Sequence, residues 1–346
     1  MANLIEEAKR AIDGLLREAY RKAVEKGGLA AGVFPEGKIE IPKDVSNGDY
    51  AANHAMAGAK ALKRPPHETA GRLLSELALE DSFFESAELA GPGFLNFRLS
   101  DKWYGRVLDV IRLEGTDYGR SDDGRGERVM VEFVSANPTG PMTIGNARGG
   151  VLGDALASVL DRAGCKVWRE FYVNDAGGQV ALFAKSIEAR YLQIFMGEDA
   201  AMFPENGYHG DDITALARQI AERDGRKYLA WDSEARCRAF AAFGLPFNIA
   251  LMREHLERYR IHFDRWFLES ALHESGYVEE TVRLLAEGGY TYEKDGALWL
   301  RNTALGADKD EVLRRANGFY TYYAVDIAYH RDKFVERGFD RVIDVW

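Results

Sequence analysis

Cysteine is scarce in this chain, which contains only Cys165 and Cys237 among its 346 residues. Two cysteines so far apart form neither a metal-ligand spacing nor a disulfide framework, so the sequence predicts a reduced, cytoplasmic protein. Long apolar runs are also lacking, and none approaches the roughly 18 residues that a membrane span needs. The N-terminus is acidic and amphipathic, which argues against a secretory signal. We therefore expect no membrane association.

Positive charge is in deficit, with 45 Lys and Arg residues against 55 Asp and Glu residues and a net charge of −10. This balance disfavours generic binding of nucleic acid, because phosphate binding favours a basic surface. We predict no DNA partner. An RNA partner that is recognised by its shape stays open, because a local basic face can lie on an acidic protein. The hydrophobic fraction of 46% fits a globular protein with a sizeable core.

The first 115 residues have the pattern of a small α+β domain. Apolar residues recur at helical spacing near the start, and Pro66 suits the first turn of a later helix. Ser100 is a plausible N-cap. A polar, glycine-bearing stretch over residues 116–127 is interpreted as a linker. The predicted helices cover residues 4–19, about 50–62, 66–79 and 101–113, and two strands bent at Gly91-Pro92-Gly93 cover residues 85–100.

From residue 128 the pattern changes to strand, loop, helix and strand, which is the unit of a parallel α/β sheet. A mostly helical stretch and a hairpin turning at Asp295-Gly296 follow. The chain ends in an apolar run of strand length. The predicted elements are strands over Val129–Val134, Val167–Val173 and Arg341–Trp346, a helix over about Ala147–Ala163, and helices within about 177–285.

The loop Ser135–Asn146 lies between the first predicted strand and helix of this sheet. Ligands of open parallel sheets bind beyond the carboxyl ends of the strands, and a helix start offers N–H groups to phosphate. Gly140 and Gly145 would let the backbone approach a ligand closely. An ordinary strand-to-helix connection with an Asn cap is an equally good interpretation from spacing alone, because neither a P-loop nor a G-x-G-x-x-G motif is present.

The segment SANPTGPMTIGNARGGVLGDALA (residues 135–157) resembles the first signature of arginyl-tRNA synthetases. In that family the "HIGH" tetrapeptide of class I enzymes follows a Ser-Ala-Asn-Pro-Thr-Gly-Pro run. Here the tetrapeptide is Thr-Ile-Gly-Asn, as in tryptophanyl enzymes of the same class, so both histidines are replaced. Threonine and asparagine still donate hydrogen bonds, and we therefore predict a variant site that remains functional.

Further segments resemble the same family in the same order. The resemblance implies a Rossmann-like class I catalytic domain over residues 128–346, with a helical insertion at about 195–300, preceded by an additional N-terminal domain over residues 1–115. It also implies a catalytic domain that is incomplete at its C-terminus, because no KMSKS-type loop or anticodon-binding domain precedes Trp346. We expect such a fragment not to charge tRNA alone. The similar segments are Ser46–Met56, Ala90–Leu99, Glu170–Gln179, Gly207–Ile213 and Thr321–Phe334.

The resemblance also assigns roles to residues of the expected catalytic site. Thr143, Gly145 and Asn146 would be catalytic. ATP, accompanied by Mg²⁺, would be bound by Pro141, Thr143, Ile144, Gly145 and Asn146, and L-arginine by Glu132, Ser135, Asn137, Tyr322 and Asp326.

These assignments compete with plainer interpretations. A lone Tyr-x-x-x-Asp pattern is usually a packing residue and a solvated charge, although a pair four apart can reach one ligand from one helix face. Asn174, Asp175 and Gln179 could border the site. His330 is interpreted as structural, and we expect no protein metal site.

In the front domain, the resemblance implies that Phe94 and Asn96 read a nucleotide in the D-loop of the arginine tRNA. A ring that stacks on an unpaired base and an amide that bonds its edge are usual in RNA readout. The alternative is that Phe94 belongs to the domain core.

The resulting function is that of an arginine–tRNA ligase, with tRNA, L-arginine and ATP as partners. Two alternatives stay open at this point: a non-catalytic tRNA-binding module, and a nucleotide-binding structural protein derived from the same fold.

Overall fold

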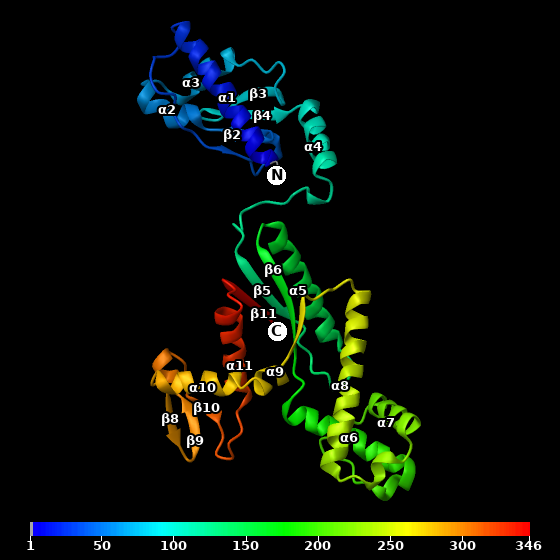
Figure 1. Cartoon of the computed structure of the whole chain (residues 1–346). Helices are drawn as coiled ribbons and strands as arrows, with labels where there is room; N and C mark the ends of the chain where they lie inside the picture. The colour runs from blue at the N-terminus through cyan, green and yellow to red at the C-terminus, as the bar shows by residue number, and fades with distance from the viewer. Residues whose placement is uncertain (1–2) are drawn as a thin grey trace. The chain divides into compact units, whose positions relative to one another are not determined.

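The computed structural model describes residues 3–346 and divides into two compact units, which meet along the chain between Ser121 and Asp122 (Figure 1). None of the helices in the described part is long and apolar enough to cross a membrane. Each unit has its own hydrophobic core, as expected for separate domains.

The first unit packs helices on a four-stranded antiparallel sheet of order β1-β2-β4-β3. Asn3 caps the first helix by accepting a hydrogen bond from the backbone of Glu6. Apolar residues of that helix and of β4 form the core, including Ile12, Leu16 and Phe97, which are fully buried. The elements are α1 (Leu4–Glu25), β1 (Ile39–Glu40), β2 (Tyr50–Ala52), α2 (His54–Leu62), α3 (Pro66–Glu76), β3 (Phe84–Ala90), β4 (Phe94–Leu99) and α4 (Asp101–Glu114).

Two predictions for this unit need correction. The helix expected from residue 50 begins at His54, because Tyr50–Ala52 is a buried strand that pairs with β4. Ser100 does occupy the N-cap position of α4, but its hydroxyl makes no capping hydrogen bond. Three strand residues are too few to give a visible alternation, and a serine at an N-cap position does not guarantee the rotamer that the bond requires.

The second unit is built on a four-stranded parallel sheet of order β11-β5-β6-β7, which confirms the predicted class. One face of the sheet is covered by α5 and the end of α8, with Phe133, Phe171 and Met252 in the shared core. The strands are β5 (Arg128–Phe133), β6 (Lys166–Val173), β7 (Arg265–Leu268) and β11 (Arg341–Val345), and the helices are α5 (Ile144–Arg162) and α8 (Ser233–Arg258).

Two further groups of elements flank this sheet. A helical group formed by α6, α7 and the first half of α8 has Phe183, Tyr191 and Phe240 at its centre. The second group packs a small sheet of order β10-β9-β8 and α10 against α11. A single wide turn of π-helix, Asp332–Glu336, continues α11. The bounds are α6 (Gly177–Met196), α7 (Asp211–Asp224), α9 (Ser270–Glu274), α10 (Tyr277–Glu287), β8 (Thr291–Lys294), β9 (Ala297–Leu300), β10 (Glu311–Arg314) and α11 (Tyr322–Arg331).

Three features of this unit differ from the predictions. The range expected to be mostly helical contains β7, which joins the central sheet, and β10 was not expected. Both strands have only four residues, which is too short for a period to distinguish them from a helix. The helix α5 begins at Ile144 rather than at about Ala147, because Thr143 caps it.

The helix α5 packs so closely on β5 that one of its glycines has no room for a side chain. A Cβ atom on Gly153 would lie 2.2 Å from Cγ of Phe133, whereas a Cβ atom on Gly149 would meet nothing within 4 Å. We expect Gly153→Ala to lower the free energy of unfolding of the second unit by about 1–3 kcal/mol through overpacking. Gly149→Ala, the matched control, should raise it by about 0.5–1 kcal/mol, because alanine favours a helix. Urea unfolding measures both. Equal effects of the two substitutions would contradict the close packing.

Candidate active site

Three carboxylates form a row across the central sheet. Glu132 on β5 lies in register with Glu170 on β6 and with Asp344 on β11. Residues in register on neighbouring strands share a face of the sheet, and like charges placed directly opposite each other are destabilising. Glu132 is 6% exposed and Glu170 is fully buried. The row therefore requires cations close by.

The cations come from the segment that ends α11. The Nζ atom of Lys333, which is fully buried, lies 2.6 Å from Oε2 of Glu132 and 2.9 Å from Oδ1 of Asp344. The guanidinium of Arg337 donates two hydrogen bonds to Glu170, at 2.6 and 2.7 Å. The hydroxyl of Tyr329 donates a third to Glu170 at 2.7 Å. Residues 329, 333 and 337 lie four apart along α11 and the π-helical turn that follows it, so this one segment supplies all three groups.

The three carboxyls differ in their affinity for protons. Burial raises the pKa of Glu132, and the neighbouring Lys333 only partly offsets this. For Glu170 burial acts in the same direction, but the hydrogen bonds from Arg337 and Tyr329 outweigh it and its pKa lies below the usual value. Burial is likewise outweighed at Asp344, where hydrogen bonds from His330 and Lys333 lower the pKa to about 2.

His330 is therefore part of this network. Its Nε2 atom lies 3.1 Å from Oδ2 of Asp344, and its Nδ1 atom lies 2.9 Å from the carbonyl oxygen of Asp326. The hydrogen bond to Asp344 raises the pKa of His330. Within residues 3–346, no group of three or more His, Cys, Asp and Glu side chains is arranged to hold a metal ion.

A strained turn directly follows β5 and lies next to the row of carboxylates. Val134 and Ser135 both have positive φ angles, 69° and 39°, which are unusual for residues other than glycine, most of all for a β-branched one. The turn directs the hydroxyl of Ser135 back to Glu132, to which it donates at 2.8 Å. The same oxygen accepts a hydrogen bond from the backbone N–H of Tyr172. Strain of this kind is held in place by its surroundings and is common at functional sites.

A second acidic cluster lies beside Glu132. The hydroxyl of Tyr172 donates to Glu269 at 2.9 Å. Burial raises the pKa of Asp326, and the charges of Glu269 and Glu132 raise it further, so these three carboxylates are electrostatic neighbours. Tyr322, one helical turn before Asp326 on α11, is 76% exposed. Glu132, Ser135 and Asp326 thus belong to one acidic cluster, whereas Tyr322 lies at a more exposed position.

Sequence reasoning missed Glu269. This residue directly follows β7, and β7 itself was not recognised as a strand. The available signal was a charged residue at the carboxyl end of a parallel strand, where ligands bind. The segment is held by Asp175, whose carboxylate accepts hydrogen bonds from the backbone N–H and the hydroxyl of Ser270. The amide nitrogen of Asn174 donates to the carbonyl oxygen of Ala176 at 3.0 Å and to the carboxylate of Glu269 at 3.2 Å.

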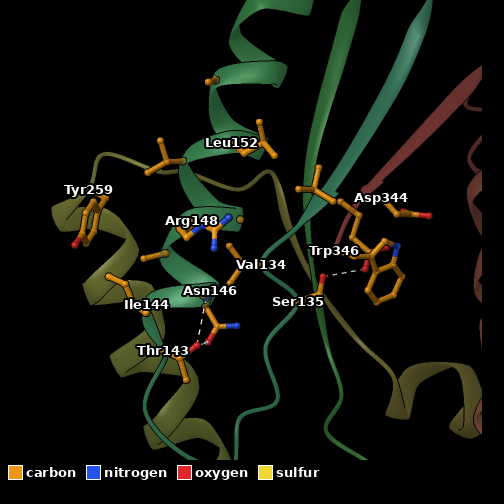
Figure 2. Close-up of a pocket in the computed structure, with 17 residues that line it drawn as sticks. Val134, Ser135, Thr143, Ile144, Asn146, Arg148, Leu152, Tyr259, Asp344 and Trp346 are labelled. Atoms are coloured by element: carbon orange, nitrogen blue, oxygen red, sulfur yellow. Dashed lines mark hydrogen bonds between the residues drawn. The ribbon is translucent and has the colours of Figure 1, made fainter.

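The start of α5 lines a cavity of about 1070 Å³ (Figure 2). Figure 2 shows Thr143 and Asn146 on one side and Asp344 and Trp346 on the other. Glu132, Ser135, Ile144 and Gly145 also line it. Thr143 and Asn146 form a reciprocal capping box: the Oδ1 atom of Asn146 accepts from the backbone N–H of Thr143 at 2.8 Å, and the Thr143 hydroxyl accepts from the N–H of Asn146.

A neighbouring pocket of about 610 Å³ shares Ser135, Thr143 and Asn146 with this cavity and is also lined by Asn137 and Pro141. Asn137 is exposed and donates to Gln179 at 2.7 Å. The loop is anchored to α8, because the buried Asn248 donates to the carbonyl oxygen of Pro138 at 2.8 Å. The two pockets and the acidic cluster therefore converge on the carboxyl ends of β5 and β6.

In the first unit, Phe94 and Asn96 lie on β4. The residues that follow each of them, Leu95 and Phe97, belong to the apolar core. Phe94 is half-buried and outside the apolar core. Asn96 is only 4% exposed and pairs with Ala51 and Glu88 on the flanking strands. The ring of Phe94 is thus partly available to a partner, whereas the amide of Asn96 is nearly covered.

Comparison with known proteins agrees with this geometry. Residues 10–99 match the family described as the arginyl tRNA synthetase N terminal domain, and residues 111–346 match the catalytic domain of class I (R) tRNA synthetases. The chain belongs to the arginyl-tRNA synthetase family. Arginine–tRNA ligases from Acetivibrio thermocellus and Ruminiclostridium cellulolyticum are 49% and 48% identical over all of this chain. The chain spans 61% of the length of each.

Solved structures support the same assignment. A protein from Campylobacter jejuni assigned as an arginyl-tRNA synthetase superposes with a TM-score of 0.65 at 32% identity, covering 72% of this chain and 54% of its own. The Thermus thermophilus arginyl-tRNA synthetase superposes with a TM-score of 0.52 at 25% identity, covering 92% of this chain and 53% of its own. The resemblance inferred from the segments is therefore confirmed at the level of family and fold.

The ion pair between Arg337 and Glu170 predicts a large cost when only one partner is removed. Arg337→Met should lower the free energy of unfolding by about 3–5 kcal/mol, because it leaves a buried carboxylate without its cation. Glu170→Gln in addition should recover most of the loss. Arg341→Met is the control, because its pair with Glu127 is largely exposed and should contribute about 1 kcal/mol or less.

The pH dependence gives a second check on the same pair. Since the pKa of Glu170 is lowered from 4.5 in the folded protein, its contribution is present above that pH and is lost as the pH falls through the folded value. Denaturant unfolding between pH 7 and 3 measures this dependence. If Arg337→Met had the same free energy of unfolding as the unaltered chain, and the same dependence of that energy on pH, the pair would not be needed for stability.

Proposed function

We propose that the chain contributes to arginine–tRNA ligase activity by binding L-arginine and ATP at the carboxyl ends of β5 and β6. The observation that carries this proposal is that Glu132, a member of the acidic cluster, lines the same cavity as the N-terminus of α5. Arginine brings a guanidinium and an ammonium group, which carboxylates bind well, and ATP brings phosphates, which helix N-termini bind well. One cavity wall, at Glu132 and Ser135, is common to both regions.

The arginine pocket is proposed to consist of the residues that the family resemblance suggested together with Glu269. Asp326 and Glu269 would face the guanidinium, whose planar donors suit paired carboxylates. Glu132 would accept from the α-ammonium group, and Asn137 and Tyr322 would complete the rim. A neutral pocket would not distinguish arginine from an uncharged analogue of the same shape, whereas this one should.

ATP is proposed to enter with Mg²⁺ as its counter-ion and to place its phosphates at the start of α5. The capping box uses the Oδ1 atom of Asn146, so the amide nitrogen is free to donate to a phosphate oxygen. The Thr143 hydroxyl donates to Asn146 at 2.8 Å. Gly145 lets the backbone approach without a side chain, and Pro141 stiffens the loop. Thr143, Gly145 and Asn146 are the residues proposed to act on the reacting phosphate, and Ile144 lines the same site.

The proposed reaction has two steps. The carboxylate of arginine attacks the α-phosphorus of ATP, which forms arginyl-adenylate and releases pyrophosphate. A ribose hydroxyl at the 3′ end of tRNA then attacks the arginyl carbonyl, and AMP leaves. The pocket residues would hold the two reactants in line and stabilise developing charge, which accounts for a large share of catalysis in reactions of this type.

The first unit is proposed to contact the D-loop of tRNA through Phe94, with Asn96 beside it. A stacking ring is the main requirement, since base stacking on aromatic side chains gives affinity without a fixed base identity. A cytoplasmic location is part of the same proposal, because tRNA is aminoacylated where translation occurs.

Binding of L-arginine tests the proposed pocket. Asp326→Ala should raise the dissociation constant for L-arginine by about tenfold or more, because the guanidinium loses a charge-assisted partner. The affinity for ATP with Mg²⁺ should stay unchanged. Isothermal titration measures both ligands, and Asp308→Ala, an exposed aspartate outside the pocket, is the control. Citrulline, in which a neutral ureido group replaces the guanidinium, should bind the unaltered chain weakly. Equal affinity for arginine in Asp326→Ala would refute the assignment.

The tRNA contact is tested separately. Phe94→Ala should weaken binding of arginine tRNA by about 1–3 kcal/mol, the range for loss of one stacked base, with little change in melting temperature. Tyr104→Ala, an exposed tyrosine on α4 that is 54% accessible, serves as the control. Filter binding and thermal unfolding give the two readouts. A large drop in melting temperature with unaltered affinity would instead place Phe94 among the residues that stabilise the unit.

A further inference from the structure

The most unusual side chain in the second unit is Lys333, a lysine with no solvent exposure. Lysine is almost never fully buried unless it is paired. Its ammonium group contacts Glu132 at 2.6 Å and Asp344 at 2.9 Å and lies 4.1 Å from the ring centre of Tyr329. Both carboxylates line the large cavity, whereas the lysine does not. Lys333 therefore lies behind the cavity wall and acts on whatever the cavity binds through its partners.

We propose that Lys333 is a positioning residue of the arginine pocket, whose ammonium group keeps Glu132 ionised and fixed in orientation so that Glu132 can accept the substrate's α-ammonium group. This inference rests on the proposed function. It assigns Lys333 no contact with substrate. The charge of Lys333 is the reason why a buried glutamate can serve as an anionic ligand.

The geometry fixes both oxygens of Glu132. Lys333 binds Oε2, and the Ser135 hydroxyl donates to Oε1 at 2.8 Å. A carboxylate accepts about four hydrogen bonds, so each oxygen retains a position for a ligand. The two contacts come from segments that are far apart in the sequence. Ser135 belongs to the strained turn after β5, and Lys333 belongs to the π-helical turn after α11.

The surrounding charges show why the lysine is needed. Glu132 lies in register with Asp344 on β11 and Glu170 on β6, and it interacts electrostatically with Tyr172 on β6 and with Asp326 and Tyr329 on α11. Glu269, after β7, acts on the same Tyr172 and Asp326. The other cations near the row are Arg337, which is bound to Glu170, His330, which is bound to Asp344, and Arg265 on β7, which lies in register with Glu170. Without Lys333, Glu132 and Asp344 would be adjacent carboxylates with too little positive charge, and one of them would bind a proton near neutral pH. Burial already raises the pKa of Glu132.

A purely structural clamp makes a different prediction from a positioning residue. If Lys333 only fastened α11 to the sheet, its loss would lower stability and weaken arginine and ATP alike. A positioning residue instead changes arginine affinity selectively, and does so in a pH-dependent way. The difference arises because a protonated Glu132 cannot accept an ammonium group from the substrate but regains that ability when it ionises.

The test uses the whole chain carrying Lys333→Met, with Lys333→Arg as the conservative variant and Lys309→Met as the control on an exposed lysine. Isothermal titration with L-arginine and with ATP and Mg²⁺ is carried out between pH 6 and 8. We expect Lys333→Met to weaken arginine binding about thirtyfold at pH 7, with ATP affinity within about twofold, and arginine affinity to rise steeply with pH. Lys333→Arg should restore most of the affinity and the shallow pH profile of the unaltered chain.

Should Lys333→Met fail to fold, Lys333→Gln, which keeps a hydrogen-bond donor but removes the charge, is subject to the same measurements. A folded variant that binds arginine with unaltered affinity and pH profile would overturn the inference. A parallel loss of arginine and ATP affinity would overturn it in favour of the clamp.

Failure of the proposed function is distinguished from failure of the inference by a measurement that needs no ligand. The side-chain carboxyl of Glu132 is followed by NMR in protein labelled with ¹³C-glutamate, and its signal is assigned with Glu132→Gln. If the unaltered chain does not bind arginine, the proposed function falls. The inference then still requires the pKa of Glu132 to rise by about two pH units when Lys333 is replaced by methionine. An unchanged Glu132 titration would overturn it.

Discussion

The second unit depends on one constraint: three carboxylates in register across β11, β5 and β6 must be neutralised, mainly from the segment that ends α11. Lys333 and Arg337 supply the charge, and Tyr329 supplies a hydrogen bond. Apolar residues of similar size would often stabilise a protein as much, because burying ions is costly. What the ions add is specificity. They fix the orientation of the last helix, and they set the charge of the pocket wall at Glu132.

The loop that follows β5 lacks regular structure but is held at three points. The positive-φ turn at Val134 and Ser135 fixes its beginning, the hydrogen bond from Asn248 to Pro138 fixes its middle, and the capping box of Thr143 fixes its end. Each anchor belongs to a different element. A loop held in this way needs little further ordering when a ligand binds, so less of the interaction energy is spent on ordering the chain.

Sequence reasoning recovered what long patterns and ordered motifs encode. The α1 periodicity, the β3–β4 bend and the parallel sheet were all predictable, as was the family. The strands β2 and β7 were not, because three or four residues carry no readable period. Glu269 was missed together with β7. Nothing in the sequence distinguishes Lys333 from a surface lysine, since its burial follows from the carboxylate register, and the nearly complete burial of Asn96 likewise depends on strand pairing.

The sequence separation within the charged row has a consequence for how the chain folds. Lys333 lies 201 residues after Glu132, and the backbone of Arg128 is bonded to Asp340, 212 residues later. Contacts between such distant segments form slowly, and during synthesis β5 exists long before β11. Throughout that interval β5 is an open edge that carries an unneutralised glutamate. An inward-pointing charge discourages pairing with foreign strands. Before Lys333 and β11 have been synthesised, the charge of Glu132 therefore also disfavours aggregation of the unfinished sheet through its open edge.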